Sequence, residues 1–228
     1  PLRRATARGL PEGLDALILA SDLQGIVPDP QTREATLLGV AVAQVLVEAS
    51  RSHGLPKAVR TGVVLAGDLY SVPGANERGG FGDVAPVWAA FAERFAWVVG
   101  VAGNHDDVRA VQDIPDAHLL DGRDVVLDGL TFGGVGLIAG NPKKPGRRSE
   151  DEQLTRIEKV TDEALDVLIL HEGPHGEREQ PGHAGIREIV ERQKVPLTVC
   201  GHVHWTTPLA QHAGGQILNV DARVVVLV

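Results

Sequence analysis

The stretch WVVGVAGNHD, residues 97–106, decides how this chain is expected to fold. Its first six residues are small or apolar, three of them valines, and they predict a buried strand. The strand ends at Gly103, and Asn104, His105 and Asp106 follow at once. On its own, a Gly-Asn pair after a strand most often marks only a turn. The segment becomes informative because other apolar runs in the chain end in the same kinds of residue.

Four further apolar runs are followed by potential ligands. The runs cover residues 14–20, 63–66, 167–170 and 197–200, and they lead to Asp22, to Asp68, to His171, and to His202 with His204. In layered α/β folds the carboxyl ends of strands meet along one edge of the sheet, and binding sites lie there. We therefore expect these side chains to converge with those of residues 104 and 105.

The segments between these runs predict helices and a hairpin. Asp29 followed by Pro30 is typical of a helix N-terminus, and the apolar spacing beyond it predicts a long helix that stops near Gly54. Ser149 and Glu152 form a capping box that begins another helix. Further expected elements are helices at 87–95 and near 186–190, a hairpin over 125–132, a long loop over 71–86 and a strand-rich tail from 217 to 228.

Composition limits the class of protein. With 228 residues, of which 43% are hydrophobic and 23% charged, we expect one globular domain over residues 1–228. The formal net charge of −8 argues against general binding to nucleic-acid backbone or to an anionic membrane. The single cysteine, Cys200, cannot form an internal disulfide, and no apolar run is long enough to span a bilayer. A cytoplasmic location is therefore expected.

The residue types at the expected site are those of a metal centre. Asp, Asn and His without Cys suit Mn, Fe, Zn or Co better than a structural thiolate zinc site. Seven such side chains follow the strands, which is too many for one open catalytic ion. They suit two ions about 3.5–4 Å apart that share a bridging carboxylate.

Five short motifs along the chain resemble those of one enzyme family. They are Asp22-Leu23-Gln24, Gly67-Asp68, Gly103-Asn104-His105-Asp106, His171 and Gly201-His202-Val203-His204. In this order, each after a strand, they are similar to the Asp-x-His, Gly-Asp, Gly-Asn-His-Asp/Glu, lone His and Gly-His-x-His motifs of calcineurin-like metallophosphoesterases. The resemblance spans residues 22–204, and it implies a four-layer α/β/β/α sandwich of two mixed sheets flanked by helices.

The resemblance also implies a metal role for most of these residues. Asp68 would bridge two divalent ions, with Mn favoured among the candidates. Asp22 and His204 would hold the first ion, and Asn104, His171 and His202 would hold the second.

His105 would not bind metal but would face the scissile phosphate. In such a site two cations bind phosphoryl oxygens and lower the pKa of a shared water, and the resulting hydroxide attacks phosphorus in line. His105 would protonate the leaving oxygen or stabilise developing charge. Asp106 either orients the His105 ring or serves as a helix N-cap.

Gln24 departs from these motifs, because the family usually has His at this position. A glutamine offers only its amide oxygen, which is a weaker ligand than imidazole for these ions. The first ion would then be bound loosely, bound with extra water, or absent. His175, four residues after His171, is a substitute ligand, a substrate contact or simply a solvated side chain.

A basic loop follows the hairpin. It contains Lys143, Lys144, Arg147 and Arg148. Such a loop is either a solvated surface segment or a set of contacts for substrate phosphate, and the sequence leaves both interpretations open.

Together these features favour a metal-dependent phosphoesterase. The chain has little room for a separate cap domain, which favours a phosphodiester, a cyclic nucleotide or a small phosphomonoester as substrate. No membrane partner and no extended nucleic acid are expected, and the sequence does not set the oligomeric state. The alternative is a catalytically weak binding or scaffold subunit, as a retromer subunit of the same fold is. Against it, burying so many polar groups unpaired at one spot would cost stability.

Overall fold

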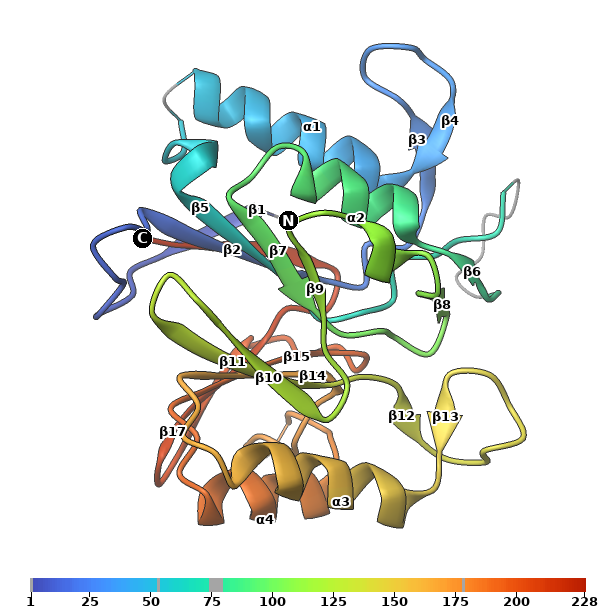
Figure 1. The fold of residues 1–228 in the computed structure, drawn as a ribbon. Helices are drawn as coiled ribbons and strands as arrows, with labels where there is room; N and C mark the ends of the chain where they lie inside the picture. Colours follow the sequence, from blue (N-terminus) through green and yellow to red (C-terminus); the bar gives the residue numbers. More distant parts are fainter. Residues whose placement is uncertain (1, 53, 74–79, 178) are drawn as a thin grey trace.

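A computed structural model describes residues 2–52, 54–73, 80–177 and 179–228. Within these residues the chain forms two six-stranded sheets that lie face to face (Figure 1). Helices α1 (Leu38–Arg51) and α2 (Ala85–Ala92) cover the outer face of one sheet, and α3 (Glu150–Thr161) and α4 (Ala184–Arg192) cover the outer face of the other. The four-layer α/β/β/α order expected from the motifs is confirmed.

The first sheet has the strand order β1-β18-β2-β5-β7-β9. Its strands are β1 (Leu2–Ala5), β18 (Arg223–Leu227), β2 (Ala16–Ser21), β5 (Thr61–Leu65), β7 (Trp97–Gly100) and β9 (Ala117–Leu119). The strands from β2 to β9 are parallel, whereas β18 is antiparallel to β2 and parallel to β1. The parallel strands therefore send their carboxyl ends to one edge.

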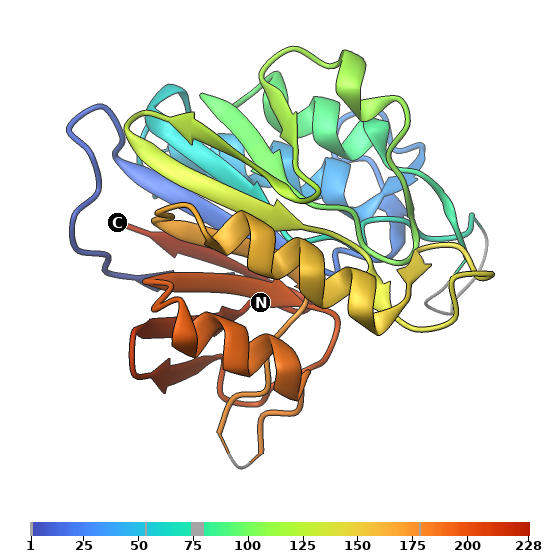
Figure 2. The same ribbon diagram turned by 60° about the horizontal axis from the view of Figure 1, so that its bottom comes forward.

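The second sheet has the order β10-β11-β14-β15-β17-β16. Its strands are β10 (Arg123–Leu127), β11 (Leu130–Val135), β14 (Val167–Glu172), β15 (Leu197–Gly201), β17 (Gly215–Asn219) and β16 (Leu209–His212). The four central strands are parallel, and the edge strands β10 and β16 are antiparallel to their neighbours. Figure 2 gives a second view of the two sheets and of the helices α3 and α4 beside them.

The remaining elements are short strand pairs and 3₁₀ turns. They are the pairs β3 (Ile26–Pro28) with β4 (Ala35–Leu37), β6 (Gly82–Asp83) with β8 (Asp106–Asp107), and β12 (Ile138–Ala139) with β13 (Arg147–Arg148), and the 3₁₀ turns η1 (Ala58–Arg60) and η2 (Val111–Asp113). Among the described residues, no helix is long and apolar enough to cross a membrane.

Three apolar clusters fill the spaces between the four layers. Successive side chains of a strand point to opposite faces. In β2, Ile18 therefore packs under α1 and α2, whereas Leu17 and Leu19 pack against the second sheet. A third cluster, which includes Ile157 and Ile189, seals α3 and α4 onto the second sheet. Cys200 is buried there as a free thiol.

Most elements predicted from the sequence are present, including the hairpin over 125–132 and the helix capped by Ser149, whose side chain accepts from Glu152 N. The predicted helix start at Asp29 is wrong. Asp29 Oδ1 instead accepts from the backbone N–H groups of Gln31 and Thr32 at 2.8 Å, which makes a turn inside the β3–β4 hairpin. The helix begins only at Leu38. The expected loop over 71–86 lies partly outside the described residues, and its end forms β6 and the start of α2.

Candidate metal centre

The strand ends converge at the edge shared by the two sheets. Asp68 follows β5 of the first sheet, His171 lies near the end of β14, and His202 follows β15 of the second. Each of these three residues offers one ligand atom, and the three atoms lie within 4.8 Å of one another. Strands of both sheets thus contribute to one cluster.

His171 lies at the centre of the cluster and is fully buried. Its Nδ1 is 2.8 Å from the carbonyl oxygen of Ala66, which can only accept, so Nδ1 carries a proton. Its Nε2 faces Asn104 Oδ1 at 3.1 Å and Asp68 Oδ1 at 3.4 Å. A lone pair and two acceptor oxygens cannot face one another stably unless a proton or a cation lies between them.

The motif glycine Gly103 brings two of these strand ends together. A Cβ built on Gly103 would lie 2.1 Å from both the backbone N and Oδ1 of Asp68. Any side chain at residue 103 would therefore displace the carboxylate. The tight approach also lets the backbone N–H of His105 donate to Asp68 Oδ1 at 3.0 Å.

The charges of the cluster set the protonation of its members. Burial alone would raise the pKa of Asp68, but the charge of His171 and its hydrogen bond lower it to about 2. Burial would lower the pKa of His171, but the carboxylates of Asp68 and Asp22 raise it to about 10. Burial and the neighbouring His171 lower the pKa of His202 to about 4. At neutral pH Asp68 is thus ionised and His202 neutral, which are the forms that bind metal.

Asp68, Asn104, His171 and His202 fit a divalent cation. Their donor atoms are a carboxylate oxygen, an amide oxygen and two imidazole nitrogens, a set that suits Mn, Fe, Zn or Co. The raised pKa of His171 favours a proton on Nε2, which a bound cation would replace. Asp68, Asn104, His171 and His202 could therefore hold the ion that the sequence motifs imply.

His105 lies at the rim of the cluster. Its side chain is 30% exposed, and its Nε2 is 3.9 Å from Asp68 Oδ2. Its Nδ1 is 2.5 Å from the carbonyl oxygen of Gly80, so the loop that precedes β6 fixes the tautomer with a proton on Nδ1. The free Nε2 is the atom that faces the centre.

Asp106 has neither of the two predicted roles. Its Oδ1 accepts from the backbone N–H groups of Leu69 at 2.8 Å and Tyr70 at 3.2 Å, and its Oδ2 accepts from Gly103 N at 2.9 Å. It lies in β8 and caps no helix, and its described hydrogen bonds are to backbone rather than to the His105 ring. Asp106 ties the loop after β5 to the loop after β7.

The side chains expected at a first ion do not gather in the same way. Asp22 Oδ2 accepts from Ser21 Oγ at 2.7 Å and from His202 N at 3.0 Å. Burial raises the pKa of Asp22 to about 7. Gln24 Nε2 is buried without a hydrogen-bond partner among the described residues. His204 has Asp221 Oδ2 at 2.7 Å from its Nδ1 and Arg223 Nη2 at 3.4 Å from its Nε2.

The basic loop divides into two parts. Arg148 is buried and donates through Nη2 to both carboxylate oxygens of Asp121 at 3.0 Å, so its charge is used within the protein. Arg147 lies close enough to the centre to contribute to the lowered pKa of His202, and its buried Nε has no partner within the described part of the chain. A Cβ on Gly146 would lie 2.2 Å from the carbonyl oxygen of Asn104, which shows how closely this loop lies against the site.

The remaining predicted contacts are at the surface. Lys143, Lys144 and His175 are exposed. His175 makes no described side-chain hydrogen bond, whereas its backbone N donates to the carbonyl oxygen of His183 at 3.2 Å. Arg147 is therefore within electrostatic reach of His202, and the two lysines are exposed on the same loop.

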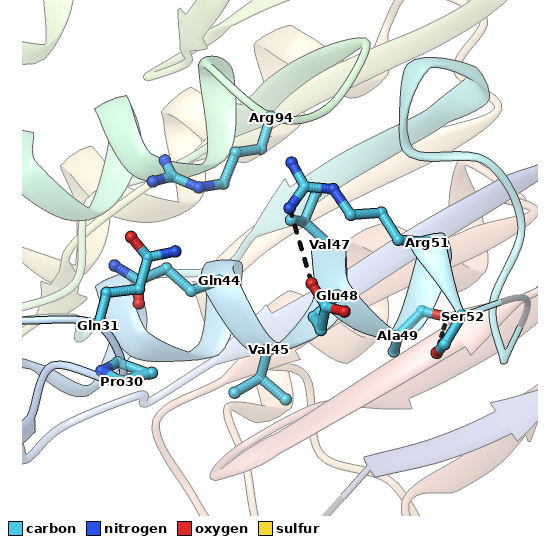
Figure 3. Close-up of a pocket in the computed structure, with 10 residues that line it drawn as sticks. All are labelled: Pro30, Gln31, Gln44, Val45, Val47, Glu48, Ala49, Arg51, Ser52 and Arg94. Carbon is cyan, nitrogen blue, oxygen red and sulfur yellow. Dashed lines mark hydrogen bonds and ion pairs between the residues drawn. The ribbon is translucent and has the colours of Figure 1, made fainter.

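A separate hollow of about 510 Å³ lies on the outer side of α1 (Figure 3). Gln44, Glu48 and Arg51 of α1 line it together with Arg94. None of the predicted site residues lines this hollow, so it does not belong to the metal centre.

Sequence reasoning missed two polar residues beside the centre. Asp221 and Arg223 are buried, and both contact His204. Asp221 comes two residues after the end of β17, so the rule that found the other strand-end residues would have found it too. Arg223 begins β18 and carries no such signal.

Comparisons with known proteins give the family and the fold. A family model described as calcineurin-like phosphoesterase matches residues 40–206. The crystal structure of TT1561 from Thermus thermophilus has a TM-score of 0.61 and 14% sequence identity, over 90% of this chain and 88% of that one. A protein of unknown function from Aquifex aeolicus has a TM-score of 0.41 and 15% identity, over 92% of this chain and 95% of its own. Among curated proteins, none matches this sequence. The likeness to TT1561 concerns the fold alone.

Proposed function

Because the chain belongs to the calcineurin-like phosphoesterase family, we propose that it is a metal-dependent hydrolase of a small phosphate ester. The substrate class is a phosphodiester, a cyclic nucleotide or a small phosphomonoester. The observation that carries the proposal is the His171 ring, whose Nε2 faces two acceptor oxygens at 3.1 and 3.4 Å. That arrangement is suited to a cation and has no evident use in a core that only packs.

The chain's own residues would divide the work. Asp68, Asn104, His171 and His202 would hold the ion, which when bound polarises a phosphoryl oxygen and supplies a nucleophile at neutral pH. The carbonyl of Gly80 holds the His105 ring with Nε2 toward the centre. With a second proton on Nε2, the imidazolium would pass that proton to the leaving oxygen or stabilise its developing charge, while Nδ1 keeps its proton on the Gly80 carbonyl.

Arg147 would bind the substrate. Its buried Nε has no described partner, and a guanidinium presents a planar pair of donors that matches phosphate oxygens. Lys143 and Lys144, exposed on the same loop, would attract the anion from a distance. Arg148 would support the loop through Asp121 rather than touch the substrate.

Two further features of the proposal rest on the sequence. A single cysteine fits a reducing, cytoplasmic compartment. The length of the given chain fits one domain over residues 1–228. The two-ion mechanism implied by the motifs has less support, because Nε2 of His204 lies 3.4 Å from Nη2 of Arg223.

Hydrolysis assays with defined metal content test the proposed function. Protein stripped with chelator and then supplied with Mn²⁺ is assayed on p-nitrophenyl phosphate and on bis(p-nitrophenyl) phosphate. We expect Mn²⁺-dependent turnover of at least one ester, and loss of that turnover in His171→Ala. His118→Ala, which changes a histidine in β9 of the first sheet, is the matched control and should keep its activity.

Absence of turnover in metal-loaded protein would contradict the enzyme assignment. A chain that binds metal but hydrolyses neither ester would be the scaffold or binding subunit that the sequence allows as an alternative. Activity that survives both the chelator and His171→Ala would place the chemistry elsewhere in the molecule.

A further inference from the structure

His204 is occupied by the protein at both ring nitrogens. Its Nδ1 lies 2.7 Å from Asp221 Oδ2, and its Nε2 lies 3.4 Å from Arg223 Nη2. Its side chain is 62% exposed, whereas that of Asp221 is 3% exposed. The two buried partners hold an otherwise open side chain in one orientation.

The chemistry of the two partners fixes the state of the ring. An arginine can only donate, so Nε2 of His204 accepts from Arg223. Asp221 accepts, so the ring proton is on Nδ1. The only lone pair of the imidazole therefore points at a cation that the protein itself supplies. A metal ligand needs that lone pair free.

The fold holds Asp221 and Arg223 firmly in place. Asp221 forms a β-bridge with Ser21 next to Asp22, and its backbone N–H donates to Asn219 Oδ1 at 3.1 Å. Arg223 begins β18, donates to the carbonyl oxygen of Asp221 at 3.2 Å and also donates to that of Trp205. Asp221 thus lies in the connection between β17 and β18, and Arg223 is the first residue of β18.

His171 provides the contrast within the same structure. One of its ring nitrogens donates to a carbonyl, and the other faces two acceptor oxygens. His204 instead has an acceptor at one nitrogen and a donor at the other, and so needs no further ion. Gln24, in the remaining ligand position of the motif, has an amide in place of an imidazole.

We propose that this chain holds one resident divalent cation, at Asp68, Asn104, His171 and His202, and that Asp221 and Arg223 keep His204 from binding a second. The residues of the first-ion position therefore do not fit the pair of ions implied by the family motifs. The identity of the occupied position rests on the proposed function, whereas the number of ions is measured without reference to hydrolysis.

Counting bound manganese tests the proposal. Stripped protein is equilibrated with Mn²⁺, freed of excess ion, and measured by elemental analysis and by electron paramagnetic resonance. We expect one ion per chain, with the signal of an isolated Mn²⁺ rather than of a spin-coupled pair. His204→Ala should keep that ion, and His171→Ala should lose it. Two ions in the unaltered protein, or loss of the ion in His204→Ala, would overturn the proposal.

Variants designed to bind a second ion test the role of Arg223. Gln24→His alone should still bind one ion, because His204 stays engaged. Gln24→His combined with Arg223→Met should bind two ions and show spin coupling. A second ion in Gln24→His alone would show that Arg223 does not hold His204 back. If the double variant does not fold, the counts for the unaltered protein and for His204→Ala still decide the matter.

The two proposals fail in different ways. One ion without hydrolysis would leave the ion count standing and remove the enzyme assignment. Hydrolysis with two ions would leave the enzyme standing and remove the single-ion inference.

Discussion

His105 is held at the rim of the metal centre by its own backbone and by a loop carbonyl, and it is not one of the three described residues whose ligand atoms lie within 4.8 Å of one another. His105→Ala should therefore keep its metal and lose about 10²–10⁴-fold in kcat, the usual contribution of a general acid or base. Manganese content and kcat, measured on one preparation, check this. His118→Ala serves as the control, because its ring lies in β9. Loss of metal from His105→Ala would make that ring a ligand.

The protonation of His171 makes the stability of the metal-free protein depend on pH. Its folded-state pKa is raised from 6.5 to about 10, so the folded protein keeps a proton that the unfolded chain loses. This contribution to the free energy of unfolding is complete below about pH 6.5 and is lost as the pH rises toward about 10.

The urea midpoint of chelated protein should accordingly fall between about pH 6.5 and 9, over the first part of that window. Excess Mn²⁺ should stabilise the protein more at the upper end, because the cation replaces the proton. The same titration on His171→Gln should show a weaker dependence on both pH and metal. A midpoint that is flat in chelated protein would mean that no proton is held between His171 and Asp68.

Residue types explain why part of the site could be predicted. Asp68, Asn104, His171 and His202 each follow or end a buried apolar run, so the parallel topology brings them together. The orientation of a side chain after such a run is not encoded in the same local pattern. His204 stands two residues from His202, yet its direction depends on Asp221 and Arg223, which come almost twenty residues later.

At the level of elements, the basic residues on and next to the loop between β12 and β13 have different expected roles. Lys143 and Lys144 would attract the anionic substrate, whereas Arg148 would stabilise the loop. Lys143→Gln with Lys144→Gln should raise KM roughly two- to fivefold at low ionic strength, and the effect should fade as salt screens the charges. Lys57→Gln with Lys159→Gln is the matched control on other exposed lysines. An unchanged KM at low salt would return the loop to a solvated role.

Arg148→Met, in β13 at the end of this loop, should behave differently. Its side chain is buried against Asp121, so its loss should lower the free energy of unfolding by roughly 1.5–3 kcal/mol, the range for a charged hydrogen bond. Urea unfolding measures this. An increase in KM without a loss of stability would instead make Arg148 a substrate contact.

Helix α1 shows where local signals mislead at the level of elements. Asp29 and Pro30 have the chemistry of a helix start, but the same Asx geometry also closes a turn. The pairing of β3 with β4 decides between the two, and it depends on residues 35–37, which carry no strong strand signal. Strand β1 has no local signal for a similar reason, since its four residues are exposed and their partner lies over two hundred residues away.

For the whole molecule, charge predicts a preference among esters. A phosphomonoester carries two negative charges at neutral pH and a diester one, while the centre offers a single resident ion and the chain has a net charge of −8. We expect kcat/KM for bis(p-nitrophenyl) phosphate to exceed that for p-nitrophenyl phosphate by about tenfold, or about 1.4 kcal/mol. The double variant Gln24→His, Arg223→Met should shift this ratio toward the monoester. A monoester preference in the unaltered protein would count against a singly charged substrate.

The position of β18 between β1 and β2 has a consequence for how the first sheet can assemble during synthesis of the chain. Residues 223–227 leave the ribosome long after β2, β5, β7 and β9, so a nascent chain can assemble those four strands but must leave one side of β2 open. Strand β1 (Leu2–Ala5) is synthesised over two hundred residues before its partner β18, so it cannot form this pairing during that interval. Until β18 emerges, β2 therefore presents a free apolar edge, the kind of surface to which other chains and chaperones bind.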